Sequence, residues 1–508
     1  MGDTPPSRQD PGDTPPAAVI ETHSSIVSFV GDRVYKLKKP VDLGFLDFTT
    51  RQAREEACHR EVELNRRLAP DVYLGVADVT GPDGEICDHL VVMRRMPDDA
   101  RLSTRLQAGE NVQGCLRAVA QQVAALHAEA PDSRTDPEIG EVATARAVAR
   151  NWSDSRATLD EVAGDIIGRA EIDRVNRLAL RYLAGRRRLL EQRISQGMIR
   201  DGHGDLLAQD IFCLPDGPRI LDCLDFADHY RVGDTLLDAA FLAMDLERLG
   251  HPELGERFLA WHREFSGDEP PHSLADHYLA YRAHVRAKVA GVRHAQGDAA
   301  AADQARGLHR LALEHLEQGR VLLVLVGGVP GAGKSTVARA LSEQRSAALL
   351  RSDEIRKDLA GLPHGADAAD AYRQGLYAPE QVSRVYGELR ERARDLLEGG
   401  VSVVLDASWS SAHEREQAAE LARETSADLV QLQCSVPLEV ARARLAARPR
   451  DSDPSDATDE VLQAMTRDID PWPQAATIHT GDAIDTVLAS VRRAVRDQLE
   501  HVGDDGPP

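Results

Sequence analysis

A glycine-rich stretch, GGVPGAGKST at residues 327–336, constrains the fold of this chain more than any other feature. It fits the spacing G-x4-G-K-S from Gly328 to Ser335, and it lies between the apolar run VLLVLV at 321–326 and a helical segment. Glycines in such a turn let backbone N–H groups point inward and form a nest for phosphate oxygens. The sequence therefore predicts a parallel α/β domain that binds nucleotide phosphates.

Eight residues of this loop are predicted to contact ATP: Gly328, Pro330, Gly331, Ala332, Gly333, Lys334, Ser335 and Thr336. We expect Lys334 to act at the outer phosphates and the Ser335 hydroxyl to bind Mg²⁺. A strand–helix turn without a ligand is the alternative, but the strand, the spacing, the lysine and the serine are all present.

Apolar segments alternate with helical segments after residue 320, as VLLVLVG, SAALLRSD, VSVVLDAS and LVQLQCSV. This pattern is typical of a parallel sheet with helices on both faces, in three layers. Asp353 and Asp406 follow the second and third strands, at the edge where parallel sheets place their ligands. We expect Asp353 to accept a proton from the attacking hydroxyl and Asp406 to hold Mg²⁺ through water. Either residue is alternatively a helix cap.

An arginine-rich segment, VARARLAARPR at 440–450, contains Arg442, Arg444, Arg448 and Arg450. Arginines that close on a transferring phosphate stabilise the charge that develops there. Arg444 and Arg448 are therefore predicted catalytic residues. A charged helix face is the alternative for each of them.

With these motifs, residues 320–475 resemble a family of small P-loop kinases that includes zeta-toxin-like, polynucleotide-kinase-like and gluconate-kinase-like enzymes, of AAA ATPase type. The resemblance also rests on Ser352-Asp353-x-x-Arg356 and on Asp470-Pro471-Trp472. It implies the phosphorylation of a small hydroxylated acceptor, with Asp353 at the acceptor hydroxyl.

The first 300 residues follow a different pattern. The segment at 24–39 predicts two strands joined by a turn at Gly31-Asp32, and a helix at 51–69 and a strand at 89–96 follow. From about residue 111 the chain is mainly helical, apart from a cluster of strands and loops at 203–226. This is the order of a kinase small lobe followed by a helical large lobe.

The stretch HGDLLAQDIF at 203–212 resembles the catalytic loop of aminoglycoside-phosphotransferase-like kinases. The resemblance covers residues 22–300, and with the second half it extends to an actinobacterial-type fusion of such a kinase with a P-loop kinase. It implies that Asp205 deprotonates the acceptor hydroxyl and that Asp210, at the usual position of an Asn, binds Mg²⁺ with Asp225. Asp222 is the less favoured ligand, and we expect His203, Asp234 and Asp238 to support the loop.

The predicted small lobe should supply a lysine to the α and β phosphates and a glutamate that orients it. Lys36 and Glu61 are the predicted pair, with Lys38 and Glu63 as the alternatives. Val34 is expected beneath the adenine. No G-x-G-x-x-G precedes the lysine strand, which leaves room for a first domain that binds nucleotide weakly.

The length of 508 residues exceeds what one hydrophobic core usually supports, so two domains are expected. We predict a disordered leader at 1–20, an aminoglycoside-phosphotransferase-like bilobal kinase domain (α+β) at 21–300, a helical linker at 301–319 and a P-loop kinase domain (α/β) at 320–500. The net charge of −22 disfavours nucleic acid as a partner, and no apolar run is long enough to span a membrane.

Six cysteines without metal-binding spacing predict idle thiols in a reducing, cytoplasmic location. These features favour a bifunctional ATP-dependent kinase for small, sugar-like hydroxylated acceptors. Two alternatives remain open. In the first, a single P-loop kinase is regulated by a degenerate N-terminal domain. In the second, the chain is a zeta-toxin-like regulatory module.

Overall fold

The computed structural model of the chain describes residues 18–22, 24–42, 46–363, 378–447 and 459–502. Packing divides the chain into two compact units. Unit 1 comprises Met1–Ala143 and Arg193–Glu269, and unit 2 comprises Thr144–Gln192 and Pro270–Pro508. The sequence predicted domain boundaries at residues 300 and 320. These boundaries concern which segments fold independently, and they stay a prediction. Residues 1–17 of the predicted leader lie outside the described residues, and residues 18–20 begin a strand.

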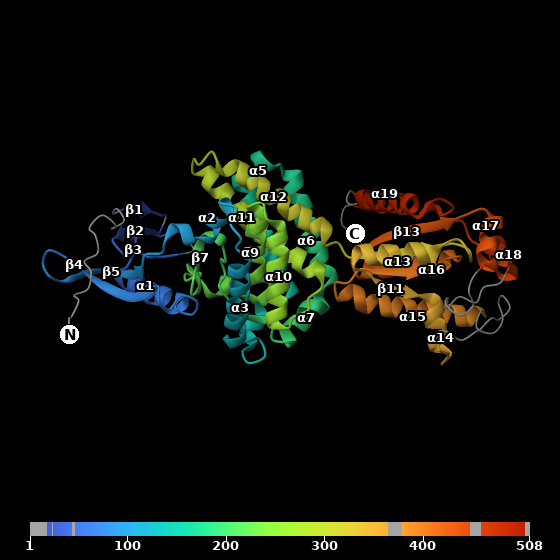
Figure 1. Cartoon of the computed structure of the whole chain (residues 1–508), viewed down its shortest axis with the longest axis horizontal. Helices are drawn as coiled ribbons and strands as arrows, with labels where there is room; N and C mark the ends of the chain where they lie inside the picture. The colour runs from blue at the N-terminus through green and yellow to red at the C-terminus, as the bar shows by residue number, and fades with distance from the viewer. Residues whose placement is uncertain (1–17, 23, 43–45, 364–377, 448–458, 503–508) are drawn as a thin grey trace, which may run out of the picture. The chain divides into compact units, whose positions relative to one another are not determined.

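Unit 1 begins with a five-stranded sheet in the order β1-β2-β3-β5-β4, in which every pair is antiparallel (Figure 1). The strands are β1 (Ala18–Glu21), β2 (Ser25–Val30), β3 (Arg33–Lys38), β4 (Tyr73–Thr80) and β5 (Ile86–Arg94). Val30 pairs with Arg33, so Gly31 and Asp32 form the predicted two-residue turn, and Gly31 has φ 59°. Helix α1 (Arg51–Asn65) packs on the sheet through Cys58 and Val62.

The rest of unit 1 is a helical part that carries short strands and loops. Its elements are η1 (Asp98–Ala100), α2 (Leu102–Gln107), α3 (Gln113–Glu129), α4 (Pro137–Glu141), β6 (Ile199–Asp201), η2 (Ala208–Asp210), β7 (Ile211–Leu214), β8 (Gly217–Ile220), α8 (Asp228–Arg231), β9 (Val232–Asp234), α9 (Thr235–Arg248) and α10 (Pro252–Ser266). Strands β7 and β8 form an antiparallel hairpin directly after the predicted catalytic loop.

Unit 2 contains a group of helices and a parallel sheet. The helices of the first group are α5 (Ala145–Ile167), α6 (Arg169–Gly185), α11 (His272–Ala295) and α12 (Ala301–Gln318), and α7 (Arg187–Ser195) runs across the boundary of the two units. Helix α5 buries Trp152 and Leu159, and α11 buries a row of small and aromatic side chains that includes Tyr278 and Ala287. An apolar stripe on each helix thus forms this part of the core.

The sheet of unit 2 has the order β11-β12-β10-β13-β14, and all its strands are parallel. Its strands are β10 (Leu322–Gly327), β11 (Ala348–Arg351), β12 (Val403–Asp406), β13 (Asp428–Ser435) and β14 (Ala476–His479). The helices around it are α13 (Lys334–Arg345), α14 (Ser352–Leu359), α15 (Pro379–Glu398), α16 (Ala412–Glu424), α17 (Leu438–Ala446), α18 (Asp459–Asp468) and α19 (Ile484–Val502).

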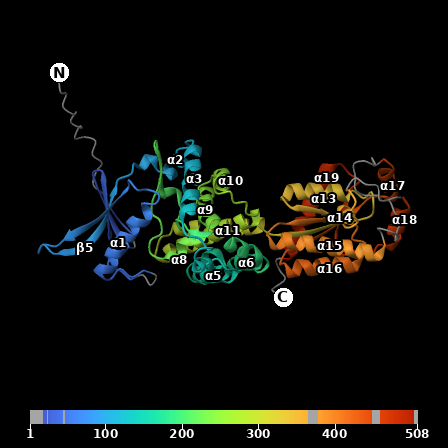
Figure 2. The same ribbon diagram turned by 90° about the horizontal axis from the view of Figure 1, so that it is seen from below.

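Successive residues of β10 face opposite sides of the sheet, as strand geometry requires. Val324 and Val326 pack with Val337 of α13 and Val491 of α19. Helices α15 and α16 contact the sheet as well, and Figure 2 shows them on the other side from α13 and α19. The predicted three-layer α/β architecture is confirmed, and β14 is a fifth strand beyond the four that the apolar runs predicted.

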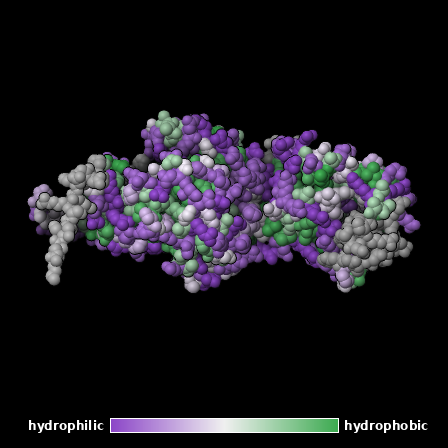
Figure 3. Space-filling view, viewed as in Figure 1, coloured by the Kyte–Doolittle hydropathy of each residue, from purple (hydrophilic) through white to green (hydrophobic). Residues whose placement is uncertain are grey.

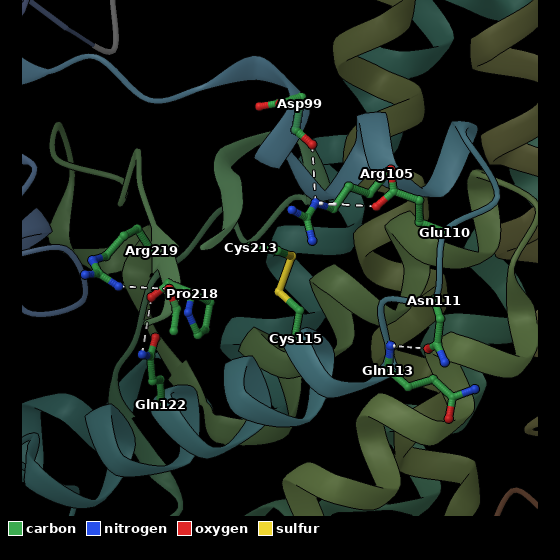
Figure 4. The surroundings of a disulfide bond; sticks show 11 residues. Asp99, Arg105, Glu110, Asn111, Gln113, Cys115, Gln122, Cys213, Pro218 and Arg219 are labelled. Carbon is green, nitrogen blue, oxygen red and sulfur yellow. Dashed lines mark hydrogen bonds and ion pairs between the residues drawn. A yellow bond between two sulfur atoms is a disulfide. The ribbon is translucent and has the colours of Figure 1, made fainter. Parts of the chain in front are cut away.

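The expectation of six idle thiols is wrong, because Cys115 of α3 and Cys213 of β7 form a disulfide. Figure 4 shows this bond and, at a second contact between α3 and the hairpin, Gln122, which donates a hydrogen bond to the carbonyl of Pro218 at 3.3 Å. The disulfide therefore ties α3 to the hairpin that follows the predicted catalytic loop. Cys58, Cys87, Cys223 and Cys434 are free.

On the face that Figure 3 shows, hydrophilic residues predominate and hydrophobic residues form small, scattered patches. None of the helices in the described part of the chain combines the length and the apolar character needed to cross a bilayer.

Candidate functional site

The phosphate loop of unit 2 connects β10 to α13 and depends on glycine at two tight positions. Gly328 and Gly331 have φ of 135° and 78°. A Cβ atom would lie 2.5 Å from the carbonyl oxygen of Cys434 at the first position and 2.6 Å from that of Ala441 at the second. Any other residue would therefore strain the loop and clash with its wall. Helix α13 begins at Lys334, whose Nζ donates a hydrogen bond to the carbonyl of Val329 at 3.1 Å. The lysine ammonium thus lies over the loop, at the positive end of the helix dipole.

Arg351, the last residue of β11, links the two predicted magnesium ligands of this site. Its Nε lies 3.2 Å from Oδ2 of Asp406, and its Nη2 donates a hydrogen bond to the Ser335 hydroxyl at 3.3 Å. Asp406 ends β12, beside β10, and is buried. The structure therefore brings Ser335 and Asp406 together around one positive charge.

Asp353 lies in the first turn of α14, which begins after β11. Its carboxylate forms an ion pair with Arg356. The side chain makes no N-cap hydrogen bond, since the N-cap residue is Arg351. The S-D-x-x-R motif is thus an ion pair between residues one helical turn apart.

Arg444, on α17, reaches the phosphate loop. Its Nη2 donates a hydrogen bond to the carbonyl of Thr480 at 2.7 Å, and the Thr480 hydroxyl donates one to the carbonyl of Ala332 at 2.6 Å. Arg442 instead lies 3.8 Å from Glu439 of the same helix. Arg448 and Arg450 lie outside the described residues, so the role predicted for Arg448 stays a prediction.

Unit 1 contains a cleft of about 500 Å³ between the five-stranded sheet and the loops that follow β6 and β8. Its apolar lining includes Phe29, Val34, Met93, Phe212 and Leu221. Its polar lining includes Lys36, Lys38, Asp205, Asp210, Asp222 and Asp225. A partly apolar cleft of this size with a few convergent charged groups is typical of a small-molecule site.

Glu61 of α1 joins the two lysines of β3. Lys36 Nζ lies 2.9 Å from Glu61 Oε1, and Lys38 Nζ lies 2.7 Å from Glu61 Oε2. The Glu61 side chain is only 1% exposed. Burial opposes its charge, but the two ammonium groups outweigh this effect and lower the pKa of Glu61 to about 2. Glu61 is therefore a permanent anion that holds both lysines in the cleft.

The two lysines differ in their second partners. Lys36 Nζ lies 3.2 Å from Asp222, and Lys38 Nζ lies 2.9 Å from Asp225. Burial works to lower the pKa of Lys36, but the negative charges of Asp222 and Glu61 outweigh it and raise that pKa well above its usual value. The Lys36 side chain is 21% exposed and that of Lys38 is 4% exposed, so Lys36 is the more accessible cation.

Asp210 ends the short helix η2 and is half-buried beside other acids. Burial and the negative charges of Asp222 and Asp205 raise the pKa of Asp210 well above its usual range. Among the described residues, no three His, Cys, Asp or Glu side chains are grouped as a complete metal cage. Mg²⁺ commonly binds through one or two carboxylates and keeps its water and phosphate ligands, so this donor set fits Mg²⁺ beside a nucleotide.

Asp238 of α9 contacts the backbone at the start of the predicted catalytic loop. Its carboxylate accepts hydrogen bonds from the backbone N–H groups of His203 and Gly204, both at 2.8 Å, and contacts His127 Nε2 at 2.9 Å. His203 is buried, and its Nε2 lies 3.1 Å from the carbonyl of Leu221. Asp234 forms a buried ion pair with Arg193 at 2.7 Å. Asp238 thus contacts the loop directly, and the support predicted from Asp234 stays a prediction.

Several residues of the two sites were not predicted from the sequence. Arg351 directly precedes Ser352-Asp353 at a strand end, which is a signal for a site residue in a parallel sheet. Thr480 follows the end of β14 in the same way. Strand β14 has only four residues, so the sequence pattern that would predict it is weak. The sequence placed Lys38 on the same face of the strand as Lys36. Its contact with Glu61 depends on how α1 packs against the sheet and could not be predicted.

The chain therefore joins an antiparallel sheet and a helical part, with the Lys36–Glu61 pair in the cleft, to a parallel α/β domain with a glycine-rich phosphate loop. A family model described as an AAA domain matches residues 323–472. The uncharacterized protein Rv2004c of Mycobacterium tuberculosis (strain ATCC 25618 / H37Rv) is 42% identical over 475 residues, which cover 93% of each chain. The chain belongs to the same family as this mycobacterial protein.

Two solved structures are similar to parts of the chain. A choline kinase from Cryptosporidium parvum Iowa II is 12% identical with a TM-score of 0.38, over 60% of this chain and 89% of that one. A gluconokinase from Sinorhizobium meliloti 1021 is 17% identical with a TM-score of 0.27, over 36% of this chain and 95% of that one.

Proposed function

We propose that this protein is a bifunctional ATP-dependent phosphotransferase that acts on hydroxyl groups of small, sugar-like acceptors. The observation that carries the proposal is that one chain holds two separate lysine-containing sites. One is the cleft with the Lys36–Glu61 pair at 2.9 Å, and the other is the glycine loop with Lys334. Lys36 lies beside Glu61 and Asp222, and the glycine loop carries Ser335, which Arg351 links to Asp406.

In unit 1, Asp205 accepts the proton of the acceptor hydroxyl. The hydroxyl oxygen then bonds to the γ-phosphorus while the bond to the ADP oxygen breaks. Lys36 binds the α and β phosphates, and Asp210 would hold Mg²⁺ together with Asp225 or Asp222. Asp225 is the favoured partner and Asp222 the alternative, and each of the two carboxylates also contacts a lysine of β3.

In unit 2, the loop residues and Lys334 bind the phosphates, and Asp353 receives the acceptor proton. Ser335 and Asp406 would hold Mg²⁺, and Arg444 stabilises charge on the transferring phosphoryl group, with Arg448 as a second candidate. Bound Mg²⁺ neutralises phosphate charge at both sites. The proposal includes a cytoplasmic location, where ATP is available. It disfavours nucleic acid as a partner because the chain carries a net charge of −22.

The test measures ADP formation by the full chain against a panel of sugars, amino sugars, aminoglycosides and nucleosides. We expect Lys334→Ala to abolish one ATP-dependent activity and Asp205→Ala to abolish a different one. Wild-type behaviour of both variants with every acceptor that is turned over would contradict the proposal.

A second candidate is a single P-loop kinase that the first part of the chain regulates. Asp210 at the position where such loops usually have an Asn, and the lack of a G-x-G-x-x-G motif before Lys36, favour it. In that case Asp205→Ala would retain every activity of the wild type, and Lys334→Ala would retain none.

A further inference from the structure

A hollow of about 610 Å³ lies in unit 2 at the end of α13 opposite the phosphate loop. Lys334 begins this helix and Arg345 ends it, so about 16 Å of helix separates the hollow from the loop. We name it the arginine hollow, because five arginines line it: Arg174, Arg320, Arg345, Arg492 and Arg496. They come from α6, α13, α19 and the short segment between α12 and β10.

The lining of the arginine hollow is positively charged, whereas the chain as a whole is negatively charged. Its five arginines face two acids in the lining, Glu317 and Glu500, although the chain as a whole carries −22. Glu317 lies 2.6 Å from Arg174 and 3.0 Å from Arg320, and Arg320 also pairs with Asp428 at 2.6 Å, so these two arginines are balanced by protein carboxylates. The remaining positive charge is concentrated on α13 and α19.

Two arginines of the hollow have no acidic partner among the described residues. Arg345 and Arg492 take part in none of the ion pairs of this region, and Arg496 has only its neighbour Asp497 at 4.0 Å. Burial, together with the positive charge of Arg320, lowers the pKa of Arg345. The fold therefore places Arg345 and Arg492 in the hollow without a carboxylate of the described residues to balance their charges.

The floor of the hollow is apolar. Leu341 and Val495 are buried in the core beneath it, and Leu499 packs against the same cluster. Guanidinium groups bind phosphate oxygens through paired N–H groups, and an apolar floor can pack against a ring. The volume lies in the range of small-molecule sites, about 300–1,000 Å³.

We propose that the arginine hollow binds a small organic phosphate of the nucleotide class, at a site separate from both phosphate-transfer sites. Arg345 and Arg492 bind the phosphate groups, and the apolar floor receives the base or another ring. A long polyanion is disfavoured, because outside the hollow it would meet a strongly acidic surface.

The location is tested by hydrogen exchange on the full chain, with inorganic pyrophosphate and with ADP as the probes. We expect both probes to slow exchange in peptides that cover 341–347 and 490–500, as well as in the phosphate loop at 327–336. ADP should slow the first two more strongly, because its ring contacts the floor. Slowing that is confined to 327–336 would overturn the proposal, and so would slowing at the hollow by anionic lipid vesicles or an oligonucleotide but by neither small probe.

The residues are tested with two charge-matched double variants in a Lys334→Ala background, which weakens binding at the phosphate loop. Arg345→Gln with Arg492→Gln removes the two unpaired cations. Arg339→Gln with Arg493→Gln removes two exposed arginines of the same helices that do not line the hollow. We expect the first variant to raise the Kd of pyrophosphate at the hollow by at least about tenfold and the second by less than about twofold. Equal effects of the two variants would overturn the assignment.

Discussion

The guanidinium Nε of Arg351 lies 3.2 Å from Oδ2 of Asp406, with both side chains less than a tenth exposed. Removal of one partner from a buried ion pair leaves an uncompensated charge, at a cost of about 3–5 kcal/mol. We expect Arg351→Gln to destabilise unit 2 by a few kcal/mol, and Mg²⁺ to stabilise this variant more than the wild type, because the cation can replace the guanidinium charge at Asp406.

Thermal unfolding with and without MgCl2 measures this effect. Arg392→Gln is the control, since its ion pair with Asp358 at 3.0 Å is more than a third exposed and should contribute less than about 1 kcal/mol. The same Mg²⁺ response in wild type and Arg351→Gln would show that Asp406 does not bind the metal.

The two lysines of β3 should separate stability from nucleotide binding. Lys38 is 4% exposed and contacts Glu61 at 2.7 Å and Asp225 at 2.9 Å, so Lys38→Met should destabilise unit 1 by about 3–5 kcal/mol. Lys36→Met leaves Glu61 paired with Lys38, and should cost less stability but abolish Mg-ATP binding in the cleft. Urea unfolding and nucleotide titration of both variants test whether Lys38→Met destabilises unit 1 more than Lys36→Met does. A larger loss of stability in Lys36→Met would contradict the prediction.

The Cys115–Cys213 bond closes a loop between residues 98 positions apart. In the chain-entropy description, a loop of this length stabilises the folded state by about 4–5 kcal/mol. We expect Cys115→Ser with Cys213→Ser to lower the urea midpoint of unit 1, and dithiothreitol to lower that of the wild type only. Cys87→Ser, at an exposed free thiol, is the control and should change neither midpoint.

Buried histidines make unit 2 sensitive to acid. Burial lowers the pKa of His277 to about 3, and burial with the positive charge of His309 lowers that of His284 to about 3. Below an unfolded pKa of about 6.5 the unfolded chain binds protons that the folded chain cannot, so stability falls as the pH falls, down to about pH 3. Each histidine should cost about 2 kcal/mol between pH 7 and pH 5.

His284→Leu isolates this effect, because both ring nitrogens of His284 are buried without a hydrogen-bond partner among the described residues. The variant should lose about 2 kcal/mol less than the wild type when the pH falls from 7 to 5. Parallel stability curves for the two proteins would contradict this assignment.

The features that could be predicted from the sequence depend on local spacing. The phosphate loop, the β2–β3 turn at Gly31 and the strand positions of Asp353 and Asp406 follow from neighbouring residues alone. Lys36 and Glu61 could be paired because strand and helix occur in the order of a small lobe, and the 2.9 Å contact agrees with that pairing.

The features that could not be predicted depend on contacts between distant segments. The register of α1 against β3 decides that Glu61 also binds Lys38. Asp222 and Asp225 are three residues apart on an irregular loop, and only its conformation, with Asp222 at φ 62°, directs them to different lysines. The disulfide and the arginine hollow likewise join segments that no sequence period connects.

The central claim is that one chain holds two independent sites for a magnesium–nucleotide complex. Calorimetric titration of the full chain with Mg²⁺ and a nonhydrolysable ATP analogue tests it most directly, since the heats at the phosphate loop and at the cleft can be removed one at a time. We predict that Lys334→Ala and Lys36→Met each remove a different binding step and that the double variant lacks both. A single step that Lys334→Ala abolishes and Lys36→Met leaves unchanged would contradict the account.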